Sequence, residues 1–251
     1  MGLSSNTIIH FTKNFTNLKG ILANNFKVSY CREKIISESK EVDYLIPMVS
    51  FCDIPFSQIL NHINNYGSYG IGLKKKWAEE QGLNPVLYIE KKSVLANSIF
   101  SDLFEKLKSG RERISDLTIE ERKAFDIIRY LKNYEGRVER MNGKVTENYR
   151  FSDEREWRYV INPEIEHNLF GNLKKASSEK VKELKKIYNE DISHISLEFS
   201  PEDINYIIIK SENERDAILN LIERVKGKNS LEEVKRLTSR IISVEQLKTD
   251  F

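Results

Sequence analysis

Apolar positions in the first ninety residues alternate between short β-branched runs and helical faces. Ile8-Ile9-His10-Phe11 predicts a strand, and the stretch from Thr12 to Asn24-Asn25 carries its apolar residues on one helical face. Ser57 is suited to cap a second helix, since its hydroxyl can accept a hydrogen bond from the first helical turn. Further strands are expected at residues 48–51, 69–73 and 85–89, and a further short helix at residues 74–81.

The middle of the chain, at about residues 92–150, is more charged and has a helical period. Its apolar positions with helical spacing are Leu103, Leu107, Phe125, Ile128 and Leu131. We interpret this stretch as a helical insertion lying over the core.

The remainder returns to strands interleaved with helices. Residues 156–161 and 194–199 alternate as strands do, and residues 206–209 are apolar throughout, as in a buried strand. Helices fit residues 177–189, 212–226 and 230–238. Because no regular strand–helix–strand period is present, the pattern favours an α+β fold with a compact mixed β-sheet. A chain of 251 residues suits a single domain at 1–251 with the insertion at about 92–150.

Charge and cysteine content narrow the functional classes. The formal net charge is +2, from 40 basic and 38 acidic residues, so no overall field draws the chain to nucleic acid or a membrane. The first residues lack the pattern of a secretory signal, and we find no apolar stretch long enough to span a bilayer. Cys31, Cys52 and four scattered His do not match zinc-site spacings. We therefore expect a cytoplasmic protein with reduced thiols, no metal and no membrane association.

Three polar segments stand out as candidates for chemistry. They are His10-Phe11-Thr12, the stretch from Ser50 through Tyr66 to Leu73, and Asp153 to Arg158. Their order resembles that of ADP-ribosyltransferases, in which a strand His precedes a helix, a strand with Gly and Tyr follows, and a late strand supplies a Glu. The resemblance implies a β-sheet core of the ADP-ribosyltransferase type with NAD as a substrate.

The resemblance also assigns roles to individual residues. His10 and Thr12 would hold NAD, and Tyr69 would stack on the nicotinamide ring. Glu156 would stabilise the positive charge that develops on the ribose as nicotinamide departs. The catalytic candidates are thus His10, Tyr69 and Glu156. The NAD-binding candidates are His10, Thr12, Ser50, Tyr66, Tyr69 and Arg158.

A second resemblance covers nearly the whole chain. The chain is similar to the AbiGi family of bacterial phage-resistance proteins in several motifs: residues 9–12, 50–55, 66–73, 84–88, 156–158 and 240–242. This resemblance implies a role in phage defence or in a toxin–antitoxin system, since the family is labelled the antitoxin half of an abortive-infection pair. It also implies a protein partner from a defence operon.

Each candidate residue has an alternative, structural interpretation. His10 suits a structural histidine of an apolar strand, and Tyr66 and Tyr69 suit core aromatics. Glu156 and Arg158 lie two residues apart on one strand face, where an ion pair is the ordinary arrangement. We expect His10, Tyr69 and Glu156 to face one cleft, and by the same alternation Trp157 to be buried.

One basic segment allows a further alternative. Lys74-Lys75-Lys76-Trp77 could contact nucleic acid, with Trp77 stacking on a base, although a solvated basic helix is the preferred interpretation.

Two functions therefore remain open. The first is an NAD-dependent ADP-ribosyltransferase or NAD hydrolase, whose acceptor is a protein, a nucleic acid or water. The second is a non-catalytic antitoxin that binds a partner toxin, with the charged helices of residues 92–139 as its contact surface.

Overall fold

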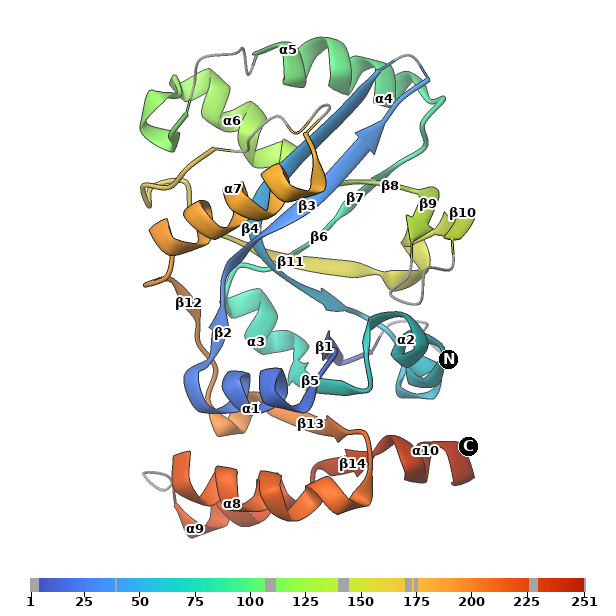
Figure 1. Cartoon of the computed structure of the whole chain (residues 1–251), viewed down its shortest axis with the longest axis vertical. Coiled ribbons are helices and arrows are strands. Elements are labelled where there is room, and N and C mark those ends of the chain that lie inside the picture. The colour runs from blue at the N-terminus through green and yellow to red at the C-terminus, as the bar shows by residue number, and fades with distance from the viewer. Residues whose placement is uncertain are drawn as a thin grey trace. The chain divides into compact units, whose positions relative to one another are not determined.

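The chain folds into two compact units with mixed α and β structure. The computed structural model describes residues 5–38, 40–106, 112–139, 145–169, 173, 176–225 and 230–250 (Figure 1). The first unit comprises residues 1–27, 50–83 and 197–251, and the second comprises residues 28–49 and 84–196. No helix of the described part is long and apolar enough to cross a membrane.

A mostly antiparallel sheet forms the centre of the first unit. Its strand order is β14 (Ile241–Ser243), β13 (Ile204–Ile209), β5 (Tyr69–Lys74) and β1 (Thr7–Thr12). The β1–β5 and β5–β13 pairs are antiparallel, whereas β13 and β14 run parallel. The predicted strands at residues 8–11, 69–73 and 206–209 are therefore confirmed.

Helices surround this sheet within the same unit. They are α1 (Phe15–Asn24), α2 (Ile59–Tyr66), α3 (Lys75–Glu80), α8 (Arg215–Val225), α9 (Leu231–Thr238) and α10 (Val244–Asp250). The Asn14 side chain caps α1 by accepting a hydrogen bond from the amide of Asn17 at 2.8 Å. Short 3₁₀ turns lie at Phe56–Gln58, Pro201–Asp203 and Glu212–Glu214, and β2 (Phe26–Lys27) follows α1. The helix expected to begin at residue 212 thus begins as a 3₁₀ turn.

Strands of the second unit form four pairs. β3 (Ser29–Ile36) runs antiparallel to β4 (Glu41–Cys52), and β6 (Asn84–Pro85) runs antiparallel to β11 (Glu156–Val160). β7 (Leu87–Ile89) lies parallel to β8 (Leu131–Asn133), and β9 (Glu135–Glu139) pairs with β10 (Val145–Arg150). The sequence pattern did not predict β3, because charged and apolar residues do not alternate regularly along it.

Most helices of the second unit occupy the stretch that was expected to be an insertion. They are α4 (Val94–Ser98), a π-helical segment (Ile99–Leu103), α5 (Phe104–Lys106) and α6 (Ile119–Ile128). A 3₁₀ turn at Ile114–Asp116 precedes α6, and another at Phe151–Glu154 precedes β11. The later part of the expected insertion forms β8, β9 and β10, so it is less helical than predicted. Residues 107–111 and 140–144 lie outside the described residues, and the single-domain interpretation stays a prediction.

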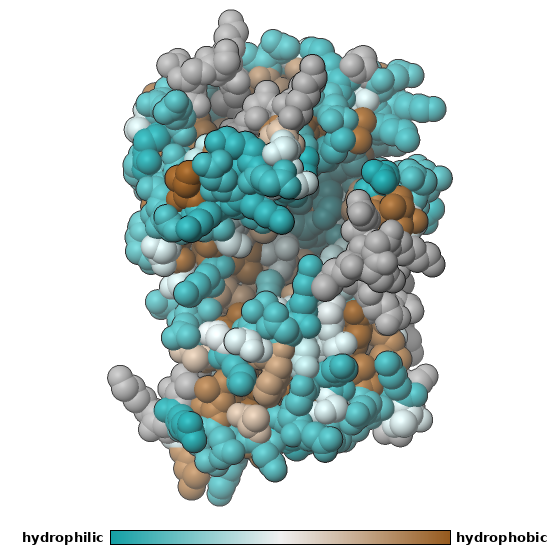
Figure 2. Space-filling view, viewed as in Figure 1, coloured by the Kyte–Doolittle hydropathy of each residue, from teal (hydrophilic) through white to brown (hydrophobic). Residues whose placement is uncertain are grey.

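The last helix of this unit is α7 (Ser178–Asp191), which carries mainly hydrophilic side chains on the face seen in Figure 2. Ser177 caps it, accepting a hydrogen bond from the amide of Lys180 at 3.2 Å. The strand expected at residues 194–199 is reduced to β12 (Ser196–Leu197).

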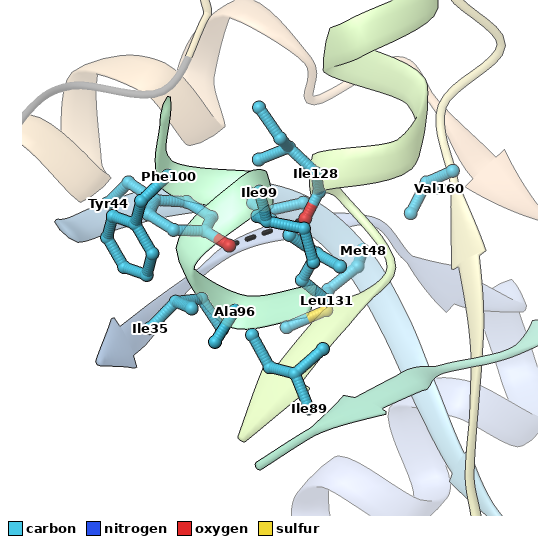
Figure 3. Packing of buried hydrophobic residues seen from close by; sticks show 11 residues of the cluster. Ile35, Tyr44, Met48, Ile89, Ala96, Ile99, Phe100, Ile128, Leu131 and Val160 are labelled. Carbon is cyan, nitrogen blue, oxygen red and sulfur yellow. Dashed lines mark hydrogen bonds between the residues drawn. The ribbon is translucent and has the colours of Figure 1, made fainter. Parts of the chain in front are cut away.

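A hydrophobic cluster joins the helices of residues 94–128 to the strands of the second unit. Figure 3 shows how its side chains converge from β3, β4, α4 and α6. Its members are Ile35, Tyr44, Ile46, Met48, Ile89, Ala96, Ile99, Phe100, Ile128, Leu131 and Val160. The Tyr44 hydroxyl donates a hydrogen bond to the carbonyl oxygen of Ile128 at 3.3 Å, so this buried polar group is satisfied. These helices are therefore part of a core rather than a cover over it.

Two neighbouring isoleucines on α6 test this assignment. Ile128 is 0% exposed, whereas Ile127 is 46% exposed. We expect Ile128→Ala to lower the free energy of unfolding by about 2–5 kcal/mol, because it removes buried contacts and leaves a cavity. Ile127→Ala should change it by about 0.5 kcal/mol or less. Denaturant melts of both variants measure the difference, and equal destabilisation would contradict the assignment.

Candidate functional site

The predicted site residues are divided between the two units. His10, Thr12, Ser50, Tyr66 and Tyr69 belong to the first unit. Glu156 and Arg158 belong to the second unit, on β11. We describe each set within its own unit.

His10 contacts Ser50 within the first unit. The His10 Nδ1 atom lies 2.9 Å from the carbonyl oxygen of Ser50, so Nδ1 carries the proton and donates. The ring packs edge-on against Phe26 and Phe51, with centroid distances of 5.1 and 5.6 Å. Burial lowers the pKa of His10, while the hydrogen bond to Ser50 acts in the opposite direction. His10 is therefore neutral at pH 7 and is held by the fold on one ring nitrogen.

Tyr69 is also engaged by the fold. It lies opposite Thr12 in the β1–β5 register, and its hydroxyl donates a hydrogen bond to the Glu214 carboxylate at 2.6 Å. Burial and the neighbouring Glu214 carboxylate raise the pKa of Tyr69 to about 12. Its ring packs against Phe15 at a centroid distance of 5.7 Å. The Tyr69 ring is thus a core aromatic whose polar end is satisfied.

Tyr66 ends α2, and its ring stacks on His62 at a centroid distance of 6.2 Å. The next residue, Gly67, has φ of 122°, and a Cβ atom there would lie 2.2 Å from the carbonyl oxygen of Thr12. Only glycine fits this close approach of two backbone segments. Gly67 therefore brings the end of α2 against the end of β1.

The Glu156 carboxylate sits inside a buried set of charges. Its Oε1 atom accepts a hydrogen bond from Arg158 Nε at 2.6 Å, and its Oε2 atom accepts one from Lys132 Nζ at 2.5 Å. Lys132 Nζ also lies 3.2 Å from Glu154 Oε2. The ion pair between Glu156 and Arg158 is confirmed, but it is buried rather than exposed, with Glu156 4% exposed and Arg158 0% exposed.

The remaining nitrogens of Arg158, on β11, contact residues on β3 and within or just before β8. Nη1 donates to the carbonyl oxygens of Arg129 and Leu131 at 3.0 and 3.3 Å, and Nη2 lies 3.2 Å from Glu33 Oε2 on β3. The backbone amide of Glu156 donates to the Tyr88 hydroxyl at 2.8 Å. We call Glu33, Lys132, Glu154, Glu156 and Arg158 the β11 charge cluster.

Electrostatics keep this cluster ionised despite burial. Burial by itself raises the pKa of Glu156, but Arg158 and Lys132 outweigh it and lower that pKa to about 2. Burial likewise opposes the charged forms of Lys132 and Arg158, yet the carboxylates around them raise the pKa of both. Glu156 is therefore a permanent anion at neutral pH, with each oxygen on a cation.

The alternation expected along β11 is reversed. Glu156 and Arg158 point into the second unit, whereas Trp157 is half-buried. The prediction assumed that the apolar residue turns inward, and it was wrong because the charges on β11 compensate one another inside. Lys132 was not anticipated, since it is an isolated Lys in a short strand. Three alternating charges of both signs at Glu154, Glu156 and Arg158 were the available signal.

Trp77 does not match the alternative of a base-stacking residue. It is 3% exposed, and its Nε1 atom donates a hydrogen bond to the carbonyl oxygen of Glu198 at 3.0 Å. It belongs to an aromatic group with Phe26 and Phe51. The nucleic-acid interpretation of Trp77 is therefore wrong.

Among the described residues, no group of three His, Cys, Asp or Glu side chains is arranged to hold a metal ion. Cys31 and Cys52 are free thiols.

Comparison with known proteins gives one family and one curated relative. Residues 24–210 match the family model described as "Putative abortive phage resistance protein AbiGi, antitoxin". The chain is 29% identical over 226 residues to the abortive phage resistance protein AbiGi of Lactococcus lactis subsp. cremoris, covering 83% of this chain and 90% of that protein. No solved structure matches the chain.

The β11 charge cluster predicts a specific response to acid. Glu156 has a pKa of about 2 in the folded protein, against about 4.3 for an unfolded Glu. Its stabilising effect is complete above about pH 5 and is lost as the pH falls toward 2, because the unfolded chain takes up the proton first. Glu156→Gln should lower the free energy of unfolding at pH 7 by about 3–5 kcal/mol, since Arg158 and Lys132 lose a buried partner.

Denaturant melts between pH 2 and pH 7 measure this effect. The free energy of unfolding of the Glu156→Gln variant should depend less on pH below 5 than that of the parent. Glu120→Gln, at an exposed position on α6, serves as the matched control and should keep the parent's profile. A Glu156→Gln variant with the parent's stability and pH profile would show that the cluster does not stabilise the fold.

Proposed function

This chain belongs to the AbiGi family of abortive phage resistance proteins, and from this premise we propose that it acts in phage defence as an antitoxin. In this proposal it neutralises a partner toxin by direct binding. The proposal takes the family description for the antitoxin role and takes the mode of action from the geometry of Glu156.

One observation carries the choice of binding over catalysis. A carboxylate that stabilises a developing ribosyl cation must present an oxygen to the substrate. Both Glu156 oxygens already contact cations of the same unit, and the residue is 4% exposed. The residue on which transferase chemistry would depend is thus used to stabilise the fold.

The face of α6 that carries Ile119, Lys123 and Ile127 is our proposed contact surface for the toxin. These residues are spaced four apart, so they share one helical face. Ile119 and Ile127 are 73% and 46% exposed, and apolar side chains among charges are typical of protein interfaces. The exposed Lys123 also pairs with Glu120 at 3.0 Å. This surface lies within the stretch of residues 92–139 expected from the sequence.

A rival proposal is supported by a different observation. Five residues expected to hold NAD belong to the first unit, where His10 contacts Ser50 and Thr12 lies opposite Tyr69. In the rival, this group binds NAD as a substrate in a core of the ADP-ribosyltransferase type. The acceptor would be a protein, a nucleic acid or water. The known partners of His10, Tyr69 and Glu156 within the fold favour the antitoxin instead.

Exchanging charges on α6 tests the contact surface. Glu120→Lys combined with Lys123→Glu preserves the i,i+3 pair while it inverts the charge pattern of the surface. We expect this variant to melt like the parent and to neutralise the toxin of its operon at least tenfold less well, measured as growth of cells that express both proteins. The control is the matched exchange on α7, Lys180→Glu with Glu183→Lys, whose side chains pair at 3.1 Å. Equal neutralisation by both exchange variants would remove α6 from the interface.

Incubation with NAD separates the two proposals. We expect the purified protein to release no nicotinamide above the buffer rate, with or without added nucleic acid or cell lysate. Release that disappears in a folded His10→Ala variant would contradict the antitoxin proposal and support the rival. A Phe11→Ala variant, altered at the adjacent position of β1, is the control for damage to the strand.

A further inference from the structure

A polar cavity of about 700 Å³ lies at α9 in the first unit. Its lining residues are Glu202, Ser230, Glu232, Glu233, Lys235 and Arg236. Glu202 comes from the 3₁₀ turn at Pro201–Asp203, and the others come from α9 and its cap. None of these residues takes part in the candidate site described above.

Arg236, which lines the cavity, has side-chain donors that lack hydrogen-bond acceptors in the described part of the chain. Its Nε and Nη2 atoms are buried and have no hydrogen-bond partner among the described residues. A guanidinium donor removed from water without an acceptor is unfavourable, so an arriving oxygen anion would be stabilised. The side chain as a whole is half-buried and contributes to the lining of the cavity.

A second arginine follows Arg236 by four residues. Arg240 lies just beyond the end of α9, and its Nη1 atom donates to the carbonyl oxygen of Ile204. Burial and then the positive charge of Arg236 lower the pKa of Arg240. An anion nearby relieves such repulsion between like charges.

The α9 N-terminus is already occupied by a group of this chain. The Glu233 carboxylate accepts hydrogen bonds from the Ser230 amide and hydroxyl at 2.7 and 3.0 Å. Ser230 in turn accepts one from the Glu233 amide at 3.3 Å, which completes a capping box. An anion entering the cavity therefore has Arg236, and not the helix end, as its binding group.

We infer that this cavity binds a carboxylate side chain of a partner protein, with Arg236 as the binding group. The inference rests on the proposed function, because the partner is the toxin. Glu202 and Glu232, which also line the cavity, repel a multiply charged phosphate or nucleic acid, but they suit basic residues that flank one acidic residue. Leu231, 70% exposed beside the cavity, adds the apolar contact that a protein partner requires.

Titration of the full chain with short peptides tests the cavity itself. The probe is a Lys-Glu-Lys tripeptide blocked at both ends, followed through the NMR amide signals of α9. We expect saturable shifts with this peptide, and at least fivefold weaker binding of Lys-Gln-Lys. Arg236→Gln should abolish the shifts, whereas Arg224→Gln, exposed on α8, should retain them. Absence of saturation, or equal binding of the two peptides, would overturn the inference.

Two further experiments test which kind of anion the cavity binds. Inorganic phosphate and a duplex DNA of arbitrary sequence should bind less tightly than Lys-Glu-Lys, and tighter binding of either would overturn the choice of a carboxylate. In the neutralisation assay, Arg236→Gln should lose at least tenfold in activity and Arg224→Gln none. Parental protein that fails to neutralise would refute the antitoxin function. Parental neutralisation that Arg236→Gln retains would refute only this cavity as a contact.

Discussion

The buried guanidinium of Arg158 is the constraint on which the second unit depends. A fully buried cation is tolerated only when acceptors surround it, and here they come from β3, from β11 and from the segment before and within β8. Each acceptor fixes one strand relative to the others, so the strands cannot shift their register without exposing a charge to an apolar interior. Glu156 and Lys132 complete the set, since each carboxylate oxygen of Glu156 then has its own cation.

This constraint changes how the polar motifs of the chain should be interpreted. Reactive residue types on strands suggested a catalytic site, but the same side chains have partners inside the fold. His10 donates to Ser50, Tyr69 donates to Glu214, and Glu156 binds two cations. Such partners are what buried polar groups require. The surface, in contrast, carries exposed apolar residues among charges, including Ile119 and Ile127 on α6 and Leu231 on α9. The balance therefore favours a protein that functions by binding.

The sequence predicted the fold well where burial follows a simple period. The strands β1, β5 and β13 and the helices α7, α8 and α9 were expected within a few residues, because each has a clear apolar face. The α+β class with a mixed sheet followed from their order. The strands β9 and β10 were missed, because both are rich in polar residues and carry no alternating apolar signal. The role of residues 94–128 as core elements was missed too, since charge content says little about which face is buried.

One ion pair of the candidate site was predictable from the sequence, but the direction in which its charged side chains point was not. The pairing of Glu156 with Arg158 follows from strand alternation, whereas the contact of His10 with Ser50 is seen only in the structure. The direction in which β11 faces does not follow from alternation, because it depends on Lys132, whose place beside β11 is set by a segment distant in sequence. A buried ion pair reverses the usual rule that charges point outward, and only the tertiary structure supplies the compensating charge.

The most direct measurement is the phage protection given by a charge-neutral double variant, Glu156→Gln with Arg158→Met. This pair removes one charge of each sign from the β11 charge cluster, and replacing a buried ion pair as a whole is far less damaging than breaking it. If Glu156 stabilises the fold, the double variant should be more stable than Glu156→Gln alone, and any protection lost by the single variant should return. A double variant that melts like the parent yet gives no protection would contradict the account, because it would show that the Glu156–Arg158 pair is needed for function and not only for the fold.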